Sequence, residues 1–261
     1  MIVDIISGFR KGWYIGYRLF LKSSRSERAN SKWGMVWEFA EPITLAAIFF
    51  ILRQSDVLNF DESEYPFTLF LISGLMPFQM ATSCLIRSLT TIQVHSSILD
   101  QVNMPPEALF VTNYLSYFFD SSIMYIVLVA AICIFSQLTV MGLIMGFIIL
   151  QMLGIGTLAL GMLLAPINIL YEDISKIVML SIRPVMFLSP IFYSDLDSTI
   201  LETVNNFNPF AHFLTLFREA LLGMDVTSSV SWYVIFGGSL LILVLSILFF
   251  HAALPALNRK S

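Results

Sequence analysis

Four ionisable residues lie inside long apolar stretches of this sequence and are the first candidates for chemistry: Glu38, Glu41, Asp120 and Arg183. A charge in hydrocarbon costs several kcal/mol, so such a group usually pairs, sits near the interface or lines a wet cavity. Glu38 and Glu41 share one helix side, where they could pair with preceding basic residues or relay protons. Arg183 could pair with Asp120 or face an aqueous path. The sequence leaves these alternatives open.

The histidines and cysteines indicate no metal or catalytic site. His95, His212 and His251 are scattered without ligand spacing, and Cys84 and Cys133 form no CxxC pair. The sequence also lacks the GxxxxGK[ST], GxGxxG, HExxH and GxSxG motifs of nucleotide-binding loops, zinc proteases and serine hydrolases. We therefore expect no catalytic residue, no metal ion and no cofactor in this chain, and no hydrolysis of ATP by it.

The composition places the whole chain in a membrane. Of its 261 residues 57% are hydrophobic and 12% are charged, whereas charged residues make up about 25% of a soluble domain. A helix of about 20 apolar residues crosses a bilayer. We predict an all-α polytopic membrane protein with six transmembrane helices at residues 33–52, 67–85, 108–135, 138–164, 174–193 and 232–254.

The basic residues predict the orientation of these helices. Seven of the 14 Lys and Arg residues precede Met35, and basic residues gather on the cytoplasmic side of membrane proteins. We therefore expect a cytoplasmic N-terminus, and six spans return Arg259 and Lys260 to the same side. A basic tail can also bind nucleic acid, but a cytoplasmic membrane flank accounts for this one, and we expect no nucleic-acid partner.

Residues 1–32 are predicted to form a separate amphipathic segment before the transmembrane domain at 33–261. Its apolar residues recur every three or four positions and share one helix face: Ile2, Ile6, Phe9, Trp13, Tyr17 and Phe20. Lys11, Arg18 and Arg25 repeat every seven residues on the opposite face. Such a helix lies in the membrane interface. It could be a simple anchor or a moving part at the cytoplasmic mouth of a pathway.

The cytoplasmic loop 87–107 and the outer loop 194–231 each carry helical signals. In the first, Leu89, Ile92, Ser96 and Leu99 have helical spacing. This segment could be a docking helix for a soluble partner or an ordinary connection.

In the outer loop, Asn208 is a candidate N-cap, Pro209 suits the first helical position and Gly223 suits a stop. The enclosed helix 209–222 carries Arg218 and is too short to span, which predicts a short re-entrant or interfacial helix.

Glycines in the fourth predicted span indicate close helix packing. Gly142 and Gly146 form a GxxxG motif, and Gly154 and Gly161 follow it. This spacing lets helices approach closely, either within the fold or between subunits.

Several motifs resemble the membrane subunits of type-2 ABC exporters, specifically those that export capsular polysaccharide, O-antigen or teichoic acid. They are WGMVWEFAEP at 33–42, YEDISKIV at 171–178 followed by SPIFY at 189–193, and NPF at 208–210 before a helix with Arg218 and Glu219. The resemblance covers essentially the whole chain. Relatives often have Arg-Asp where this chain has Glu172 and Asp173, so no role of that arginine is carried over.

The resemblance implies a permease subunit that moves a lipid-linked polysaccharide across the bacterial inner membrane. It implies a homodimer with the pathway between the two copies, and two ABC ATPase subunits that bind ATP and Mg and dock from the cytoplasm. Periplasmic export proteins are further candidate partners. The docking residues would be Leu89, Ile92, His95, Ser96, Leu99 and Asp100, with the N-terminal helix as a second contact.

The substrate path is assigned on the chemistry of sugars, which stack on aromatic faces and whose acidic groups attract cations. This assigns Trp37, Arg183, Tyr193 and Phe210 to the path, and Glu38, Glu41 and Arg218 to a charged gate or interface.

Three alternatives stay open. They are a type-2 ABC permease for a drug or lipid, an ion-coupled carrier, and a membrane scaffold without transport. The lack of an obvious inverted repeat with paired broken spans counts against the carrier.

Overall fold

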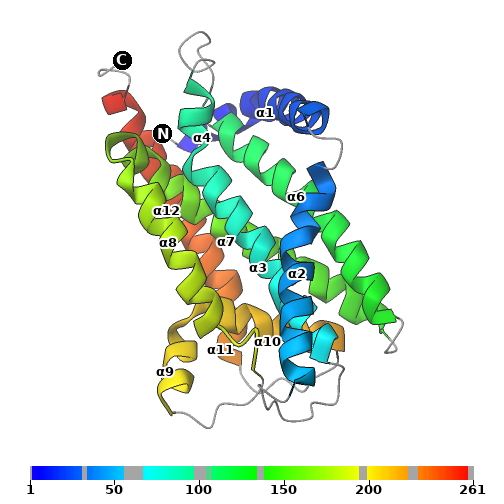
Figure 1. Ribbon diagram of the computed structural model, residues 1–261. Coiled ribbons are helices and arrows are strands. Elements are labelled where there is room, and N and C mark those ends of the chain that lie inside the picture. Colours follow the sequence, from blue (N-terminus) through cyan, green and yellow to red (C-terminus); the bar gives the residue numbers. More distant parts are fainter. Residues whose placement is uncertain are drawn as a thin grey trace.

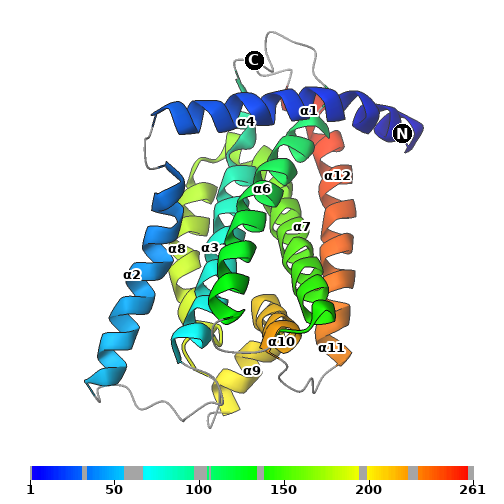
Figure 2. The same ribbon diagram turned by 90° about the vertical axis from the view of Figure 1, so that its right-hand side faces the viewer.

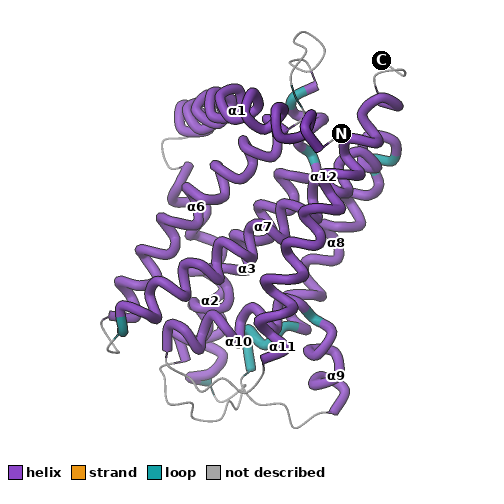
Figure 3. Tube along the Cα trace, turned by 180° about the vertical axis from the view of Figure 1, so that it is seen from behind, coloured by secondary structure: helices purple, strands orange, loops and turns teal. Residues whose placement is uncertain are grey.

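The computed structural model describes residues 2–30, 34–55, 67–96, 105, 107–133, 138–193, 199–222 and 229–257. Within these ranges the chain is helical and has no β-strand (Figure 3). The longer helices are α1 (Ile2–Asn30), α2 (Gly34–Gln54), α3 (Phe67–Leu89), α6 (Glu107–Cys133), α7 (Val140–Leu170), α8 (Asp173–Leu188), α10 (Pro209–Leu222) and α12 (Gly238–Leu257). Shorter elements are α4 (Thr91–Val94), α9 (Thr199–Phe207), α11 (Ser229–Trp232) and the π-helix η1 (Tyr233–Gly237).

The long helices form a bundle that is closed differently at its two ends. Figure 2 shows α1 lying across one end, next to α4 and the end of α12. Helices α9, α10 and α11 lie at the opposite end. We call these the α1 end and the α10 end.

Each of the six predicted spans contains a helix, but these helices differ in how well they suit a bilayer. Among the described residues, α3, α6, α7 and the stretch Tyr233–Ala253 are long and apolar enough to cross a membrane. In α2 the apolar part is only Ile43–Leu52, because Glu38, Glu41 and Arg53 interrupt it. Helix α8 has 16 residues. The chain is thus an integral membrane protein with four candidate spans in its described part.

Helix α7 lies at the centre of the bundle, because its glycines let other helices approach. A methyl group on Gly161 would lie 2.6 Å from the carbonyl oxygen of Leu85 in α3. At Gly154 it would overlap the ring of Tyr117 in α6, whose hydroxyl donates to the Leu150 carbonyl oxygen at 2.7 Å. Gly142 likewise faces α10. The predicted GxxxG face therefore packs within one chain.

Helix α1 packs on α6 through a glycine face that the hydrophobic periodicity did not predict. A methyl group on Gly12 would lie 2.9 Å from the Ala108 nitrogen, and the Thr112 hydroxyl lies 3.2 Å from the Gly16 carbonyl oxygen, to which it donates. Of the predicted apolar face, Trp13 is 56% exposed, whereas the Phe20 ring lies 6.2 Å from the ring of Phe119 in α6, so this face packs on α6 only in part. Glycine adds little to a hydrophobic pattern, yet it permits the closest backbone contact.

Helix α10 has the predicted bounds, Pro209–Leu222. The Phe210 N–H donates to the Asn208 side-chain oxygen at 3.0 Å, so the predicted cap is confirmed. Phe213 and Phe217 are fully buried, which holds this short helix inside the α10 end of the bundle.

Candidate functional site

The segment predicted to dock a partner lies at the α1 end, around the four-residue helix α4 (Figure 1). Leu89 and Ile92 are buried in the bundle, whereas His95 is half-buried and Ser96 is exposed. The most exposed apolar side chain of this segment is Val94, at 70%. Leu99 and Asp100 lie outside the described residues. The docking surface around α4 therefore consists of Val94 and of Ser96 just beyond the helix, and the docking role stays a prediction.

Hydrogen bonds tie α4 directly to α6 and α7, and through Asn168 of α7 to α8. The Asn113 amide of α6 donates to the Thr91 hydroxyl at 3.1 Å. The Asn168 amide of α7 donates to the Gln93 side-chain oxygen at 3.2 Å, and Gln93 donates back to the Asn168 carbonyl at 3.4 Å. The Asn168 side-chain oxygen also accepts the N–H of Ser175 in α8 at 3.0 Å. Sequence analysis missed Asn168, because a single asparagine in an apolar run does not show what it contacts.

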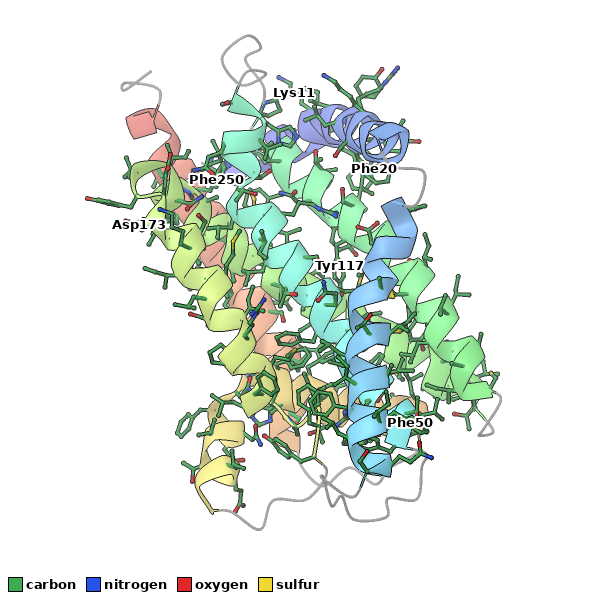
Figure 4. The ribbon with its side chains drawn as sticks, in the orientation of Figure 1. Lys11, Phe20, Phe50, Tyr117, Asp173 and Phe250 are labelled. Carbon is green, nitrogen blue, oxygen red and sulfur yellow. The ribbon has the colours of Figure 1, made fainter. Side chains whose placement is uncertain are left out.

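Helix α8 buries none of its own residues. Arg183, assigned to the substrate path, is exposed midway along it. At its start Asp173 and Lys176 form an exposed ion pair at 2.8 Å, and this hydrogen bond lowers the pKa of Asp173. Figure 4 shows Asp173 at the edge of the molecule.

Figure 2 shows α2 and α8 on the same side of α3, and Figure 1 shows that they flank α3 at the two edges of this side. Each exposes large apolar side chains. On α2 they are Ile43, Ile48, Phe50 and Ile51; on α8 they are Ile177, Met179, Leu180, Val185, Phe187 and Leu188. This side of a single chain is therefore an apolar surface that also carries the charge of Arg183.

An aromatic cluster joins α2 to the end of α8. The Phe192 ring stacks on Phe49 of α2 with centroids 4.2 Å apart, and on Phe187 of α8 at 5.3 Å. Phe50 is exposed and lies toward the α10 end (Figure 4). The neighbouring Tyr193 is half-buried, and its hydroxyl donates to the Leu188 carbonyl at 2.6 Å. Phe49, Phe187 and Phe192 were not among the predicted path residues.

Two predicted site residues are buried. Phe210 packs edge-on against Phe78 at 5.0 Å and is 7% exposed, so any contact with a substrate would require movement. Arg218 is 6% exposed, and its guanidinium donates to the Pro190 carbonyl at 2.6 Å, the Phe70 carbonyl at 3.0 Å and the Ser73 hydroxyl at 3.2 Å. In a single chain Arg218 therefore joins α10 to α3.

Three further predicted residues, Trp37, Glu38 and Glu41, belong to α2, but their side chains lie outside the described part of the structure. Their assignments to the path and the gate stay predictions.

Asp120 pairs with Arg87 rather than with Arg183. The Arg87 and Asp120 side chains form an ion pair at 3.0 Å between α3 and α6, next to a cavity of about 40 Å³ lined also by Cys84 and Tyr117. The alternative pairing of Asp120 with Arg183 is wrong, because Arg183 is exposed on α8.

The other ionisable residues do not assemble a metal site. Among the described residues, no group of three His, Cys, Asp or Glu side chains could hold a metal ion. His251 of α12 instead pairs with the buried Glu107 of α6 at 2.9 Å.

Comparison with known proteins agrees with the motif resemblance. The sequence profile of the family described as ABC-2 type transporter matches residues 16–222. The chain is 24% identical over 198 residues to an O-antigen export system permease protein RfbA of Klebsiella pneumoniae, and the match covers 74% of each chain. A second Klebsiella pneumoniae protein of that name is 22% identical over 198 residues, with the same coverage. With most of its length matched, the chain belongs to the ABC-2 type transporter family of membrane proteins.

Proposed function

We propose that this chain is the permease subunit of an ATP-driven exporter that moves a lipid-linked polysaccharide across the bacterial inner membrane. Family membership and the two relatives named as O-antigen export permeases support this function. The structural observation that carries it is the exposed side formed by α2 and α8, where Arg183 and the aromatic cluster around Phe192 lie.

A second copy of the chain is the proposed cover of that side. Lipid could cover the apolar side chains of α8, but a cation at mid-helix is costly against hydrocarbon. Two copies that face each other through α2 and α8 would enclose a path in which Arg183 stays hydrated. In this arrangement α2 and α8 complete six spans, both chain termini are cytoplasmic, and α10 is a re-entrant helix on the outer side.

The proposed path suits a sugar chain. Phe187 and Phe50 offer exposed aromatic faces for stacking, and Arg183 attracts acidic groups of the polymer. Trp37 and Tyr193 are further path residues in this proposal, with Glu38 and Glu41 at its cytoplasmic mouth. Phe210 would join them only after α10 moves.

ATP hydrolysis is assigned to a separate ABC ATPase, which would bind ATP and Mg. Its proposed contact is the exposed surface around α4, formed by Val94 and Ser96 with the half-buried His95, together with Leu99, Asp100 and the exposed side of α1. Periplasmic export proteins are proposed to meet the α10 end.

Co-purification and export tests decide this proposal. The chain and a candidate ABC ATPase are co-expressed, purified in nanodiscs and tested for equal stoichiometry. ATP-dependent movement of lipid-linked polysaccharide is then measured in inverted vesicles.

Val94→Asp should abolish the association with the ATPase, because it places a charge on the docking surface. Val140→Asp is the control, because Val140 is equally exposed but lies at the α10 end. Absence of both association and export would overturn the proposal.

A lipid is the second candidate substrate, and one observation favours it. An apolar groove of about 500 Å³ opens between α7 and η1, lined by Met145, Ile148, Trp232, Tyr233, Phe236 and Gly237. The lipid is supported as the substrate if the protein moves a phospholipid in an ATP-dependent manner and if cells that lack the protein keep their surface polysaccharide.

A further inference from the structure

Asn168 joins the docking segment to α8 by hydrogen bonds to both. Its side chain is fully buried near the end of α7. Its amide nitrogen donates to Gln93 of α4, while its side-chain oxygen accepts the N–H of Ser175 in α8. One side chain thus contacts both α4 and α8. A displacement of either helix therefore shifts the same amide group.

On one side of Asn168, α4 depends on these contacts for its position. A helix of four residues cannot hold its shape alone, because nucleation of an isolated helix is unfavourable. Besides the burial of Ile92, two polar anchors fix α4: the hydrogen bond from Asn113 to Thr91, and the pair of hydrogen bonds between Asn168 and Gln93. The two anchors lead to different helices: the first to α6 and the second to α7 and α8. Only the second can carry movement of α4 toward the exposed side of the molecule.

On the other side of Asn168, α8 is held mainly at its ends. It buries no residue fully along its length, and only Ile182 and Met186 pack, partly buried, against the hydrophobic core. At its start Ser175 presents one of the first-turn N–H groups that a helix cannot satisfy internally, and Asn168 accepts it. At its other end the Asn208 amide donates to the Ser189 hydroxyl at 2.8 Å. A shift of Asn168 therefore moves the start of α8 while its far end stays anchored.

We propose that Asn168 is a positioning residue that transmits displacement of α4 to α8, with Gln93 as its contact on the docking side. The proposal rests on the proposed function, in which the ATPase pushes α4 and α8 borders the substrate path. A buried amide left without its partner is costly, so the two helices move together rather than break the bond. The competing reading is that Asn168 only caps α8 and has no part in coupling.

The variants separate these readings. Gln93→Ala removes the α4 contact but leaves the Asn168 bond to Ser175, and it alters an exposed side chain, so folding is preserved. Gln93→Glu keeps the acceptor for the Asn168 amide and is the conservative rescue. Gln151→Ala is the matched control, since Gln151 is another buried amide of α7, bonded to Ser121 of α6 and remote from α4.

The first measurement uses the complex with its ATPase in proteoliposomes and records polysaccharide exported per ATP hydrolysed. We expect Gln93→Ala to lower this ratio about fivefold or more, the usual range of coupling between sites. ATPase stoichiometry should match the wild type, and the midpoint of thermal unfolding should fall no further than in Gln151→Ala, which also removes a hydrogen bond of a buried amide. Gln93→Glu and Gln151→Ala should keep the ratio near the wild-type value. An unchanged ratio in Gln93→Ala would leave Asn168 as a cap only and overturn the proposal.

The second measurement is independent of transport. Spin labels are placed at Val94→Cys and Leu180→Cys, both exposed, in a Cys133→Ser chain diluted with unlabelled chain in nanodiscs. The distance distribution between α4 and α8 should broaden in Gln93→Ala and stay unchanged in Gln151→Ala. If the wild type exports no polysaccharide, the proposed function fails, and this distance alone decides the role of Asn168. If the distance distribution is the same in Gln93→Ala and in the wild type, the proposed role of Asn168 is refuted.

Discussion

The guanidinium of Arg218 lies over the ring of Phe70, with its central carbon 3.6 Å from the ring centroid. It also donates to the Phe70 carbonyl oxygen at 3.0 Å, so the same residue of α3 contacts both the face and the edge of the cation. A planar fork can satisfy several acceptors at once while it stacks on an aromatic ring. This contact anchors α10 to a candidate span.

Removal of the Arg218 side chain should destabilise the fold. Arg218→Ala leaves the Phe70 and Pro190 carbonyls without their donor, which costs about 2–4 kcal/mol in total. Arg218→Lys should recover only part of the lost stability, because an ammonium group cannot reach all the oxygen acceptors that the guanidinium reaches. The check is the midpoint of thermal unfolding in detergent. Arg183→Ala is the control and should leave the midpoint unchanged, since Arg183 is exposed.

Gly154 and Gly237 should respond in opposite ways to alanine. Gly154→Ala pushes a methyl group into the Tyr117 ring, and such overpacking costs about 1–3 kcal/mol. Gly237→Ala meets nothing within 4 Å, so it should be neutral or stabilise by up to about 1 kcal/mol through helix propensity. Thermal unfolding of both variants tests this contrast. Equal losses would show that α7 is not packed on α6 in this way.

The ion pair of Arg87 and Asp120 should show positive coupling in a double-mutant cycle. Its side chains are 31% and 22% exposed, so solvent weakens the pair and we expect a coupling free energy of about 1 kcal/mol. The cycle compares Arg87→Gln, Asp120→Asn and the double variant by unfolding in detergent. A coupling energy of zero would mean that the pair adds nothing to stability.

The glycine face of α1 can be tested by proteolysis. Gly12→Val places a branched side chain where the Cβ is already 2.9 Å from the Ala108 nitrogen, so α1 should separate from α6. Trypsin should then cleave α1 severalfold faster at its basic residues. Tyr14→Val changes an exposed residue of the same helix and should leave the cleavage rate as it is. Equal rates in both variants would contradict the packing of α1 on α6.

Local sequence signals were enough to predict most of the helices and their bounds. Long apolar runs define α3, α6 and α7 because crossing a bilayer requires them. The helix 209–222 followed from Asn208 and Pro209, since capping acts within one turn. Family motifs predicted that the chain belongs to the ABC-2 type transporter family, and the match over residues 16–222 confirms this prediction. Each of these signals lies within one segment of the chain.

Tertiary structure alone decided which segments meet. The burial of Arg218, the choice of Arg87 as partner of Asp120, the glycine face of α1 and the position of Asn168 between α4 and α8 all depend on contacts between helices far apart in sequence. A periodicity describes one helix and its apolar side, but a polar residue takes its role from whatever the fold places opposite it. Sequence therefore determined that this chain inserts as helices, and packing determined which of its few polar groups are structural and which remain exposed.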